Sequence, residues 1–500
     1  MKELAGHAPP RYEFGTPSFD DWGETFERGR ALESTTYTQM LSLRRLHYKG
    51  YRRLQQACSP GSAKEMKTMP SSIPDVVAWV SLDWADQQHE GRLQAVGSSQ
   101  VESFVLPQRP EALQAWVSQL RTRFPFGRIA LAVEQSRGAL VYARMTYEFL
   151  VLYPVPPKTL ADYRKAFFSS GAKSDPQDAD LLLELLRCHA DRLRPWRADA
   201  AATRQLQLLV EHRRTLVDDR TQLTNRLTSL LKGSFPQARE WAGELGTERA
   251  CEFLTRWSSL ESLQGARRSR LRHFYLDHGG RDVTSLDRLL DQIRQAQPLT
   301  TDTAVLQASA LMVRLLAQQL STLASGLREI DQAIATLFGE HPDRSLWESF
   351  PGAGPVLAPR LLTAFGADRQ RYGQAQEVQQ FSGIAPVTER SGKSCWVHWR
   401  WACPKFLRQS FHEFAAHSRR WSAWAAAYYE QQIEKGKDHQ TAVRALAFKW
   451  IRILYRCWKD HTLYDEQRYL QALQRRGSPL VKRLQARGAL SVAPGGNMQI

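Results

Sequence analysis

Apolar residues in the first third of the chain come in short runs with the length and composition of buried strands. Three such runs cover residues 76–83, 128–134 and 149–155, and the first two end in an acid. Residues 101–106 fit a further strand next to the first, and residues 111–124 have helical spacing. Strands that alternate with helices predict an α/β domain with a central, partly parallel sheet.

A helix is expected to begin within the segment 173–180, which reads Lys-Ser-Asp-Pro-Gln-Asp-Ala-Asp and precedes an apolar run. Pro176 suits the first turn of a helix, and Asp175 suits the N-cap before it. Asp175 and Asp178 would then point the same way, while the leucines at 181, 182, 185 and 186 turn inward. Capping and the helix dipole also explain two acids at a helix start, so the pair alone does not identify a site.

Two later segments carry apolar residues at alternating steps of three and four, over residues 206–230 and 313–337. This spacing predicts long coiled-coil helices, either as an antiparallel hairpin within one chain or as the seam of a dimer. Residues 251–298 between them are expected to be a helical tip or an insertion. The arginines at 267, 268, 270 and 272 form a solvated face or grip nucleic acid.

Charge and composition then narrow the class of protein. A net charge of +17 and a pI near 9.7 predict a polyanionic partner, and nucleic acid fits because Lys and Arg neutralise phosphates. The length of 500 residues predicts two or three domains. No apolar run approaches the roughly 20 residues of a membrane-spanning helix, and the N-terminus lacks a signal-peptide core, so we expect a cytoplasmic protein without a membrane partner. The six cysteines are scattered without a Cys-x-x-Cys pair, which predicts neither disulfides nor a zinc site.

Four acids are expected to converge at one edge of the predicted sheet. Sites in such sheets form beyond the carboxyl ends of strands, where Asp83 and Glu134 arrive and where Asp175 and Asp178 would meet them. Converging carboxylates repel one another without cations, and hard oxygen ligands suit Mg²⁺ or Mn²⁺. In a basic α/β protein this set predicts the metal site of a ribonuclease-H-like nuclease. The alternative is that Asp83 and Glu134 are ordinary strand-end acids that face water.

The C-terminal part opens with Pro-Gly-Ala-Gly-Pro at 351–355, which resembles a helix-hairpin-helix turn that approaches DNA phosphates and equally fits a tight turn between helices. Residues 383–394 are expected to form a loop. Aromatic and basic residues interleave after it and either contact nucleic acid or form the core of a small helical domain; they are Trp396, His398, Trp399, Arg400, Trp401, Lys405 and Arg408.

Together these motifs resemble the transposases of insertion-sequence family one-ten, over about residues 75–465. The family motif Lys-(Thr/Ser)-Asp-x-x-Asp-Ala is matched by residues 173–179, Pro-Gly-x-Gly by 351–354, and Gly-(Leu/Ile)-x-Pro before Ser-Gly by 383–392. The resemblance implies a ribonuclease-H-like (RuvC-like) domain, a coiled coil and a mainly helical transposase domain. We place these at 73–198, 199–342 and 343–470, between a poorly ordered extension at 1–72 and a basic tail at 471–500.

The resemblance also implies the chemistry and the partners. Asp83, Glu134, Asp175 and Asp178 would hold Mg²⁺, and Ser391 would attack DNA and form a phosphoserine link, with Ser394 and Ser382 as rival nucleophiles. Donor and target DNA, a structured guide (bridge) RNA and further copies of the chain, as a dimer or tetramer, are the expected partners. The residues expected to bind nucleic acid are Lys173, Arg390, Lys393, Arg400, Lys405 and Arg408.

Two other functions fit the same residues. A structure-specific nuclease would need only the acids and would hydrolyse DNA with water, whereas a non-catalytic DNA-bridging protein would use only the coiled coil and the basic surface. The first 72 residues lie outside the resemblance. They are a lineage extension whose basic residues touch nucleic acid or are solvated, or translation starts at Met66 or Met69.

Overall fold

The computed structural model describes residues 75–134, 141, 147–168, 173–280 and 282–486. The expected N-terminal extension and residues 487–500 of the expected basic tail lie outside these residues. Among the described helices, none has the length and apolar content needed to cross a bilayer.

A five-stranded sheet forms the N-terminal domain, in the order β3-β2-β1-β4-β5. Strands β1, β4 and β5 are parallel, and β2 is antiparallel to β1 and β3, so the prediction of a partly parallel sheet is confirmed. The strand expected over residues 101–106 does form, as β3. It is not the neighbour of β1, however, because β2 lies between them. Strand β2 has no apolar run that would predict it, because it carries the polar residues His89, Arg92 and Gln94. The strands are β1 Val76–Asp83, β2 Gln88–Ala95, β3 Glu102–Pro107, β4 Arg128–Val133 and β5 Leu150–Pro154.

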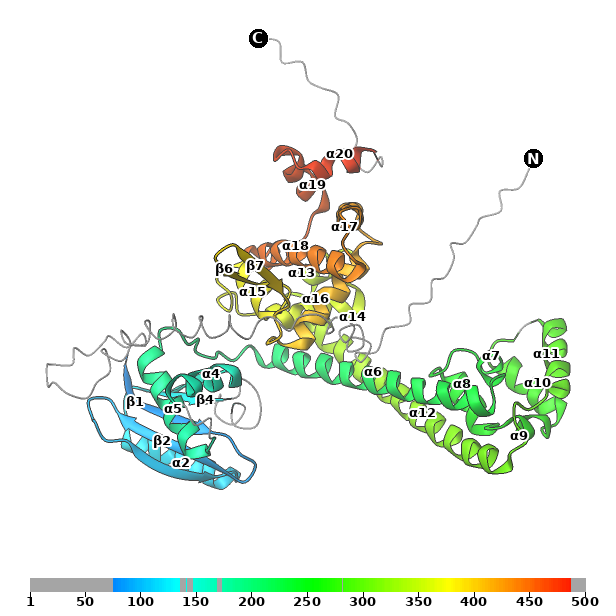
Figure 1. Cartoon of the computed structure of the whole chain (residues 1–500), viewed down its shortest axis with the longest axis horizontal. Coiled ribbons are helices and arrows are strands. Elements are labelled where there is room, and N and C mark those ends of the chain that lie inside the picture. The colour runs from blue at the N-terminus through cyan, green and yellow to red at the C-terminus, as the bar shows by residue number, and fades with distance from the viewer. Residues whose placement is uncertain (1–74, 135–140, 142–146, 169–172, 281, 487–500) are drawn as a thin grey trace, which may run out of the picture. The chain divides into compact units, whose positions relative to one another are not determined.

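Helices cover both faces of this sheet (Figure 1). Helix α2 (Pro110–Arg123) packs on one face, and α4 (Pro157–Phe167) and α5 (Asp175–His189) pack on the other. The four inward leucines of α5 are buried, as predicted. The N-cap of α5 is Ser174 rather than Asp175, which is the first helical residue, so the expected N-cap is wrong by one position.

Two long helices, α6 (Ala201–Ser234) and α12 (Thr303–Glu340), pack against each other (Figure 1). All the apolar positions predicted for α12 are buried or half-buried, but coiled-coil geometry remains a prediction. The segment between them is helical, and Arg268 and Arg272 pair there with Asp287. Its helices are α7 Ala238–Trp241, α8 Glu248–Arg256, α9 Leu260–Gln264, α10 Arg268–Asp277 and α11 Val283–Gln295.

The C-terminal part is mainly helical, and its core also takes in Leu206 and Val210 of α6. Buried aromatic residues, including Trp347, Trp424 and Trp450, fill that core. Its elements are α13 Arg344–Glu348, α14 Gly354–Phe365, α15 Ala375–Phe381, β6 Val387–Ser391, β7 Ser394–His398, α16 Lys405–Ser418, α17 Ala423–Glu434, α18 His439–Asp460, α19 Glu466–Arg475 and α20 Pro479–Ala486.

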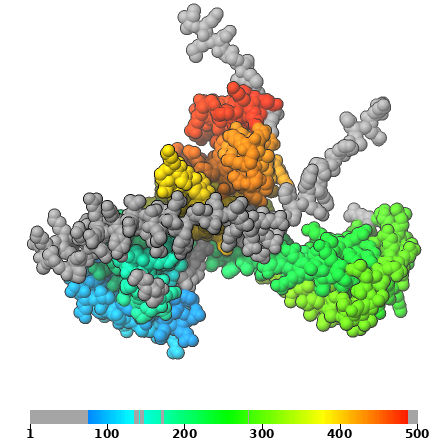
Figure 2. Space-filling view, in the orientation of Figure 1, coloured from blue at the N-terminus to red at the C-terminus, as the bar shows by residue number. Residues whose placement is uncertain are grey.

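The loop expected over residues 383–394 is wrong, because β6 and β7 pair as an antiparallel hairpin. Most side chains of this hairpin are exposed, so no alternation of apolar and polar residues marked it as strands. The hairpin lies at the surface in Figure 2, where it is yellow.

Candidate catalytic site

Asp83 and Glu134 come to adjacent positions at the carboxyl ends of two parallel strands. Leu82 of β1 pairs with Val133 of β4, and each acid is the next residue. The hydroxyl of Ser81 donates to the carbonyl oxygen of Ala179 at 2.6 Å. Side chains alternate along a strand, so Asp83 lies on the same face as Ser81, toward the start of α5.

The electrostatics of Asp83 show that the other three acids lie close enough to act on its carboxyl. Asp83 is only 5% exposed, and burial raises the pKa of its carboxyl to about 7, with further contributions from the charges of Glu134, Asp178 and Asp175. Lys173 acts in the opposite direction and lowers that pKa. Asp83 is therefore the centre of a group of mutually repelling carboxylates.

Asp178 is fully buried, although it carries a charge in its ion pair with Arg164. Nε of Arg164 donates to Oδ1 of Asp178 at 2.7 Å, whereas Oδ2 has no hydrogen-bond partner in the described part of the chain. Asp175 is exposed and Glu134 is half-buried. The site thus runs from a buried end to an open end.

This donor set fits a divalent cation. Across the ranges described, no three acid, histidine or cysteine side chains are already arranged as metal ligands. Even so, Oδ2 of Asp178 is buried without a partner in the described residues, and the pKa of Asp83 is raised. At both carboxyls a cation would stabilise the ionised form. Oxygen-only donors favour Mg²⁺ or Mn²⁺ over softer metals.

The pattern of the sequence did not reveal two arginines that hold the acidic helix in place. Arg92 is buried in β2, where Nε donates to Asp180 at 2.6 Å and Nη2 to the carbonyl oxygen of Pro176 at 3.1 Å. Arg164 on α4 holds Asp178. Asp180, which is not one of the four predicted metal ligands, is exposed and serves as the partner of Arg92. A single arginine inside a strand was the available signal for Arg92.

Ser391 lies at the tip of the β6–β7 hairpin, where it pairs with Ser394 across a two-residue turn. Gly392 has φ of +57°, and Lys393 is not among the described non-glycine residues with positive φ, which is the pattern of a type II′ turn. Both serines are exposed, and no hydrogen bond of either hydroxyl occurs in the described structure. Ser382 is fully buried.

The strand register divides the hairpin residues between two faces. Residues paired across an antiparallel ladder share a face, so Ser391 and Ser394 share theirs with Glu389 and Trp396. Arg390 pairs with Cys395 and lies on the opposite face. Arg390, which is expected to bind nucleic acid, therefore does not share the face of Ser391.

Two of the interleaved aromatic side chains, one in β7 and one just after it, are open to solvent. Trp396 is 60% exposed and Trp401 73%, so the alternative that these tryptophans form the core is wrong for both. Trp396 stacks on His398 with ring centroids 4.3 Å apart. A hydrogen bond between Nε2 of His398 and Oε1 of Glu389, at 2.9 Å, is the main cause that raises the pKa of His398.

Other residues of the basic surface are partly enclosed. Trp399 is half-buried beneath two guanidinium groups, those of Arg444 at 3.6 Å and Arg408 at 5.9 Å from the ring centroid. Arg400 is half-buried, and its Nε has no hydrogen-bond partner in the residues that the structure covers. Lys405 is exposed at the start of α16.

The structure brings the four acids together but joins Ser391 to none of them. In the described ranges, no hydrogen bond links the hairpin tip to Asp83, Glu134, Asp175 or Asp178. The acids and the serine therefore form two separate parts of the candidate site.

Comparison with known proteins matches each part separately. Residues 80–236, which contain the acids, match a family model described as "Transposase", and residues 344–430, which contain Ser391, match "Transposase IS116/IS110/IS902 family". The mixed five-stranded sheet agrees with the ribonuclease-H-like fold that the first match implies.

Similar proteins come from bacterial insertion elements. The chain is 30% identical over 347 residues to the mini-circle putative transposase for IS117 of Streptomyces coelicolor, covering 68% of this chain and 83% of that protein. It is 26% identical over 403 residues to the uncharacterized 43.6 kDa protein of insertion element IS110 from the same organism, covering 79% and 96%. The uncharacterized 42 kDa protein of IS900 from Mycobacterium paratuberculosis is 26% identical over 369 residues, covering 71% and 88%.

An acidic site on a ribonuclease-H-like sheet, with transposase matches to both halves of the chain, defines an enzyme that moves DNA. This chain belongs to the IS110 family of insertion-sequence transposases, as the resemblance predicted.

Proposed function

We propose that this transposase cuts and rejoins donor and target DNA at a composite site, in which four carboxylates hold Mg²⁺ and Ser391 is the nucleophile. The observation that carries the proposal is the convergence of Glu134, Asp175 and Asp178 on the buried carboxyl of Asp83. Such repulsion destabilises an empty site and favours a bound cation. Mn²⁺ would satisfy the same oxygen donors.

When bound, the cation would supply positive charge to the phosphate oxygens and so stabilise the charge that develops during strand cleavage. The chain itself prepares the site. Arg92 and Arg164 fix the start of α5, which sets the positions of Asp175 and Asp178. Lys173, next to this helix, adds a positive charge that favours the ionised form of Asp83 and that a DNA strand would also meet.

Ser391 would exchange one phosphodiester for another. Its Oγ forms a bond to the phosphorus, its proton passes to a base or to water, and the bond from phosphorus to one sugar oxygen breaks. The released sugar oxygen takes up a proton and leaves as a hydroxyl. Since one ester replaces another, a hydroxyl of a second DNA strand can reverse the step and join the DNA without an external energy source.

The hairpin geometry supports Ser391 over one of its rivals. Ser391 is exposed on a tight turn with a free hydroxyl in the described structure, whereas Ser382 is enclosed in the core. Ser394 is equally exposed, so only the family motif favours Ser391 over Ser394. Lys393, on the turn itself, is better placed than Arg390 to neutralise charge beside either serine.

Nucleic-acid partners would meet the exposed tryptophans and the basic residues near the hairpin. Trp396 and Trp401 offer faces on which bases can stack, and Arg400, Lys405 and Arg408 would contact phosphates. The family resemblance implies that a structured bridge RNA pairs with both donor and target DNA. A net charge of +17 suits binding of both polyanions. Assembly of two or four copies would let the acids of one copy complete the site of another.

A second function, hydrolysis of DNA by water at the acidic site, is favoured by one observation. The acids act on one another electrostatically, and no hydrogen bond joins them to Ser391 in the described residues. Such a nuclease would release cut DNA with no protein attached.

Covalent capture separates the two functions. Protein purified with its bound nucleic acid is incubated with labelled element-end DNA and Mg²⁺, then denatured and resolved on a gel. We expect labelled DNA that migrates with the protein and is released by protease, and we expect alanine at any of the four acids to abolish it without unfolding the protein. Cut DNA without any adduct would favour the hydrolytic nuclease and contradict the serine mechanism.

A further inference from the structure

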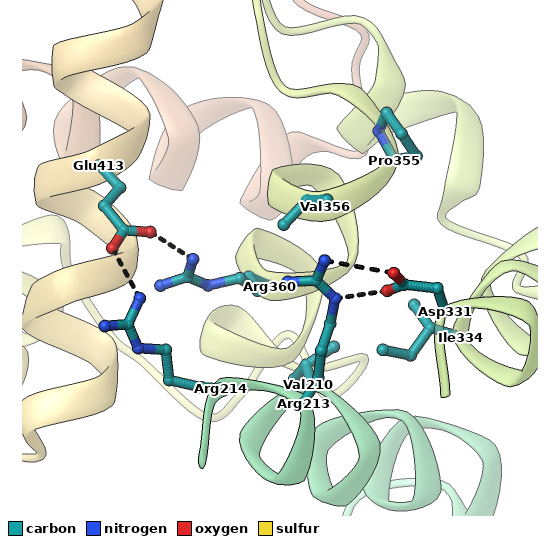
Figure 3. Close-up of a pocket in the computed structure, with 9 residues that line it drawn as sticks. All are labelled: Val210, Arg213, Arg214, Asp331, Ile334, Pro355, Val356, Arg360 and Glu413. Atoms are coloured by element: carbon teal, nitrogen blue, oxygen red, sulfur yellow. Dashed lines mark hydrogen bonds and ion pairs between the residues drawn. The ribbon is translucent and has the colours of Figure 1, made fainter. Parts of the chain in front are cut away.

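The arginines that line the cavity where helices α6, α12, α14 and α16 meet are all paired with acids (Figure 3). Arg213 pairs with Asp331, with Nη2 and Oδ2 3.3 Å apart. Arg214 donates to Glu413 at 3.3 Å, and Arg360 pairs with the same carboxylate. Positive charge without a carboxylate partner in the described residues lies instead on helix α18 and at the end of α19.

Lys449 of α18 is a half-buried lysine that no acid compensates. Its Nζ lies 4.5 Å from the ring centroid of Tyr428 and 5.6 Å from that of Trp424. Burial lowers the pKa of this ammonium group, and the charge of Arg452, one turn further along the helix, lowers it again. The side chain of Lys449 forms no ion pair and no hydrogen bond within the described ranges. A partly desolvated cation without an anion costs free energy, so its position indicates an anion that binds from outside.

The ammonium group of Lys449 can be reached from outside. Its Nζ has no hydrogen-bond partner in the described part of the chain, yet it is not one of the unpaired polar atoms that are fully buried there. The same is true of the hydroxyls of Tyr428 and Tyr469, whose half-buried rings pack against the C-terminal core. Ammonium and phenol groups both donate hydrogen bonds. These three groups are thus unused donors that a ligand can approach.

Two exposed arginines accompany these donors. Burial raises the pKa of Tyr469, and the charges of Arg452 and Arg476 act in the opposite direction, so both guanidinium groups lie close enough to act on its hydroxyl. Neither arginine side chain has an ion pair or a hydrogen bond among the residues described. Lys449, Arg452 and Arg476, which we call the α18–α19 cations, therefore form a basic group without an acidic partner in those residues.

This group lies on a side of α18 that the surface around the hairpin does not use. Arg444 of the same helix covers the ring of Trp399 at 3.6 Å. Lys449 and Arg452 follow Arg444 by five and eight residues, which corresponds to rotations of roughly 140° and 80° about the helix axis. The α18–α19 cations are therefore a surface separate from the one that contains Trp399.

The rings beside these cations offer little room for base stacking. Lys449 covers one face of Tyr428, the ring centroid of Tyr469 lies 4.8 Å from that of Trp424, and Trp424 is fully buried. Unpaired bases stack on open aromatic faces, whereas the backbone of a duplex needs only donors and positive charge. This surface therefore fits a duplex better than a single strand.

We propose that the α18–α19 cations, with the hydroxyls of Tyr428 and Tyr469, bind the phosphate backbone of duplex nucleic acid. Lys and Arg neutralise phosphates and release counterions, and tyrosine hydroxyls donate to phosphate oxygens. Contacts of this kind hold a duplex in position without reading its sequence. This surface depends on the proposed function only in that the protein binds nucleic acid, and it needs neither Ser391 nor the four acids.

Three variants and a control test the surface. Lys449→Met removes one charge and keeps a long apolar side chain over Tyr428. Arg452→Gln removes a second charge, and Arg452→Lys restores it. Arg456→Gln is the matched control, since Arg456 is an exposed arginine of the same helix that is already paired with Asp460. Each nucleic-acid-free protein is titrated with labelled duplex DNA of random sequence, without Mg²⁺, so that binding is measured without cleavage.

We expect the slope of log affinity against log salt to fall by about 1 in Lys449→Met and in Arg452→Gln, and by about 2 when both are combined. Arg452→Lys and Arg456→Gln should keep the wild-type slope. The melting temperature of free Lys449→Met should equal or exceed that of wild type, because the variant removes a partly desolvated charge. Should Lys449→Met fail to fold, Arg452→Gln, at an exposed position, still decides the outcome.

Unchanged slopes in Lys449→Met and Arg452→Gln would overturn the proposal. An unchanged slope with a lower melting temperature would overturn it too and leave Lys449 as a residue that only packs on Tyr428. A larger change of slope for single-stranded DNA than for duplex DNA would contradict the duplex assignment. Ser391→Ala should bind with the wild-type slope whether or not Ser391 is the nucleophile. Failure of the serine mechanism and failure of this surface are therefore distinguishable.

Discussion

Arg164 holds one oxygen of the Asp178 carboxylate, with Nε and Oδ1 2.7 Å apart, and leaves the other oxygen buried without a partner in the described residues. Asp83 is also buried, and the charge of Asp178 contributes to the raised pKa of its carboxyl. The two carboxylates are thus held close by the fold and compensated only in part by Arg164. A change of pH or the binding of a cation should therefore change the stability of the sheet domain.

The first prediction concerns pH. The pKa of Asp83 is raised from about 3.8 to about 7 in the fold, so its protonated form stabilises the metal-free protein fully below pH 3.8, and this contribution is lost as pH rises through 7. The effect is on the order of 1–4 kcal/mol. We expect the melting temperature of metal-free wild type to fall between pH 5 and 8 more than that of Asp83→Asn.

Mg²⁺ should reduce that fall in the wild type, since a cation stabilises the ionised carboxyl. Asp86→Asn is the control, because Asp86 is an exposed acid close to Asp83 in the sequence and is not one of the four acids. Identical pH profiles for wild type and Asp83→Asn, with no response to Mg²⁺, would mean that the acids do not form a metal site.

The second prediction concerns phosphate contacts. Arg400→Ala and Arg408→Ala should each reduce the slope of log affinity against log salt by about 1, since each would remove one phosphate contact. Arg268→Ala is the control, because Arg268 is already paired with Asp287 and Asp291. If the slope stays the same for Arg400→Ala and Arg408→Ala, these arginines serve only to pack the surface around Trp399.

The third prediction separates exposed from buried tryptophans. Trp396→Ala and Trp401→Ala should leave the melting temperature within a degree or two of wild type and weaken binding of single-stranded DNA by about 1–3 kcal/mol each. Trp450→Ala, in the core, should cost roughly 3–5 kcal/mol of stability. Normal DNA affinity in both surface variants would exclude base stacking at this face.

The fourth prediction concerns the turn beside Ser391. A Cβ at Gly392 would contact nothing within 4 Å, so Gly392→Ala acts only through its φ of +57°, at a cost of roughly 1–2 kcal/mol. We expect formation of the DNA adduct to slow about tenfold in Gly392→Ala and less in Gly392→Asn, while the melting temperature of Gly392→Ala falls by only a few degrees. Equal rates in wild type and both variants would show that the turn geometry does not matter to the reaction.

The sequence predicted those parts of the site that depend on local pattern. β1 and β4 were visible because each is an apolar run that ends in an acid, and α5 because Pro176 precedes a leucine stripe. Strand β2 was missed because buried Arg92 and His89 break the apolar pattern, and each of them is hydrogen-bonded to a side chain outside β2.

Contacts between distant residues had no local signal. The pairing of Arg164 with Asp178 depends on how α4 and α5 dock, and the cavity at Arg360 brings together residues from four helices. The hairpin that carries Ser391 was missed although its two strands are close in the sequence. Both of its faces are largely exposed, so its strands are set by the turn at Gly392 and not by burial.

The central claim is that Ser391 becomes linked to DNA, and peptide mapping of the trapped adduct tests it most directly. Trypsin cuts after Arg371, Arg390, Lys393 and Arg400, so Ser382, Ser391 and Ser394 fall in three different peptides, 372–390, 391–393 and 394–400. After the DNA is trimmed by nuclease, the account predicts a nucleotide on peptide 391–393 alone, and no adduct in Ser391→Ala. A nucleotide on 394–400 or 372–390, or an adduct that persists in Ser391→Ala, would contradict it.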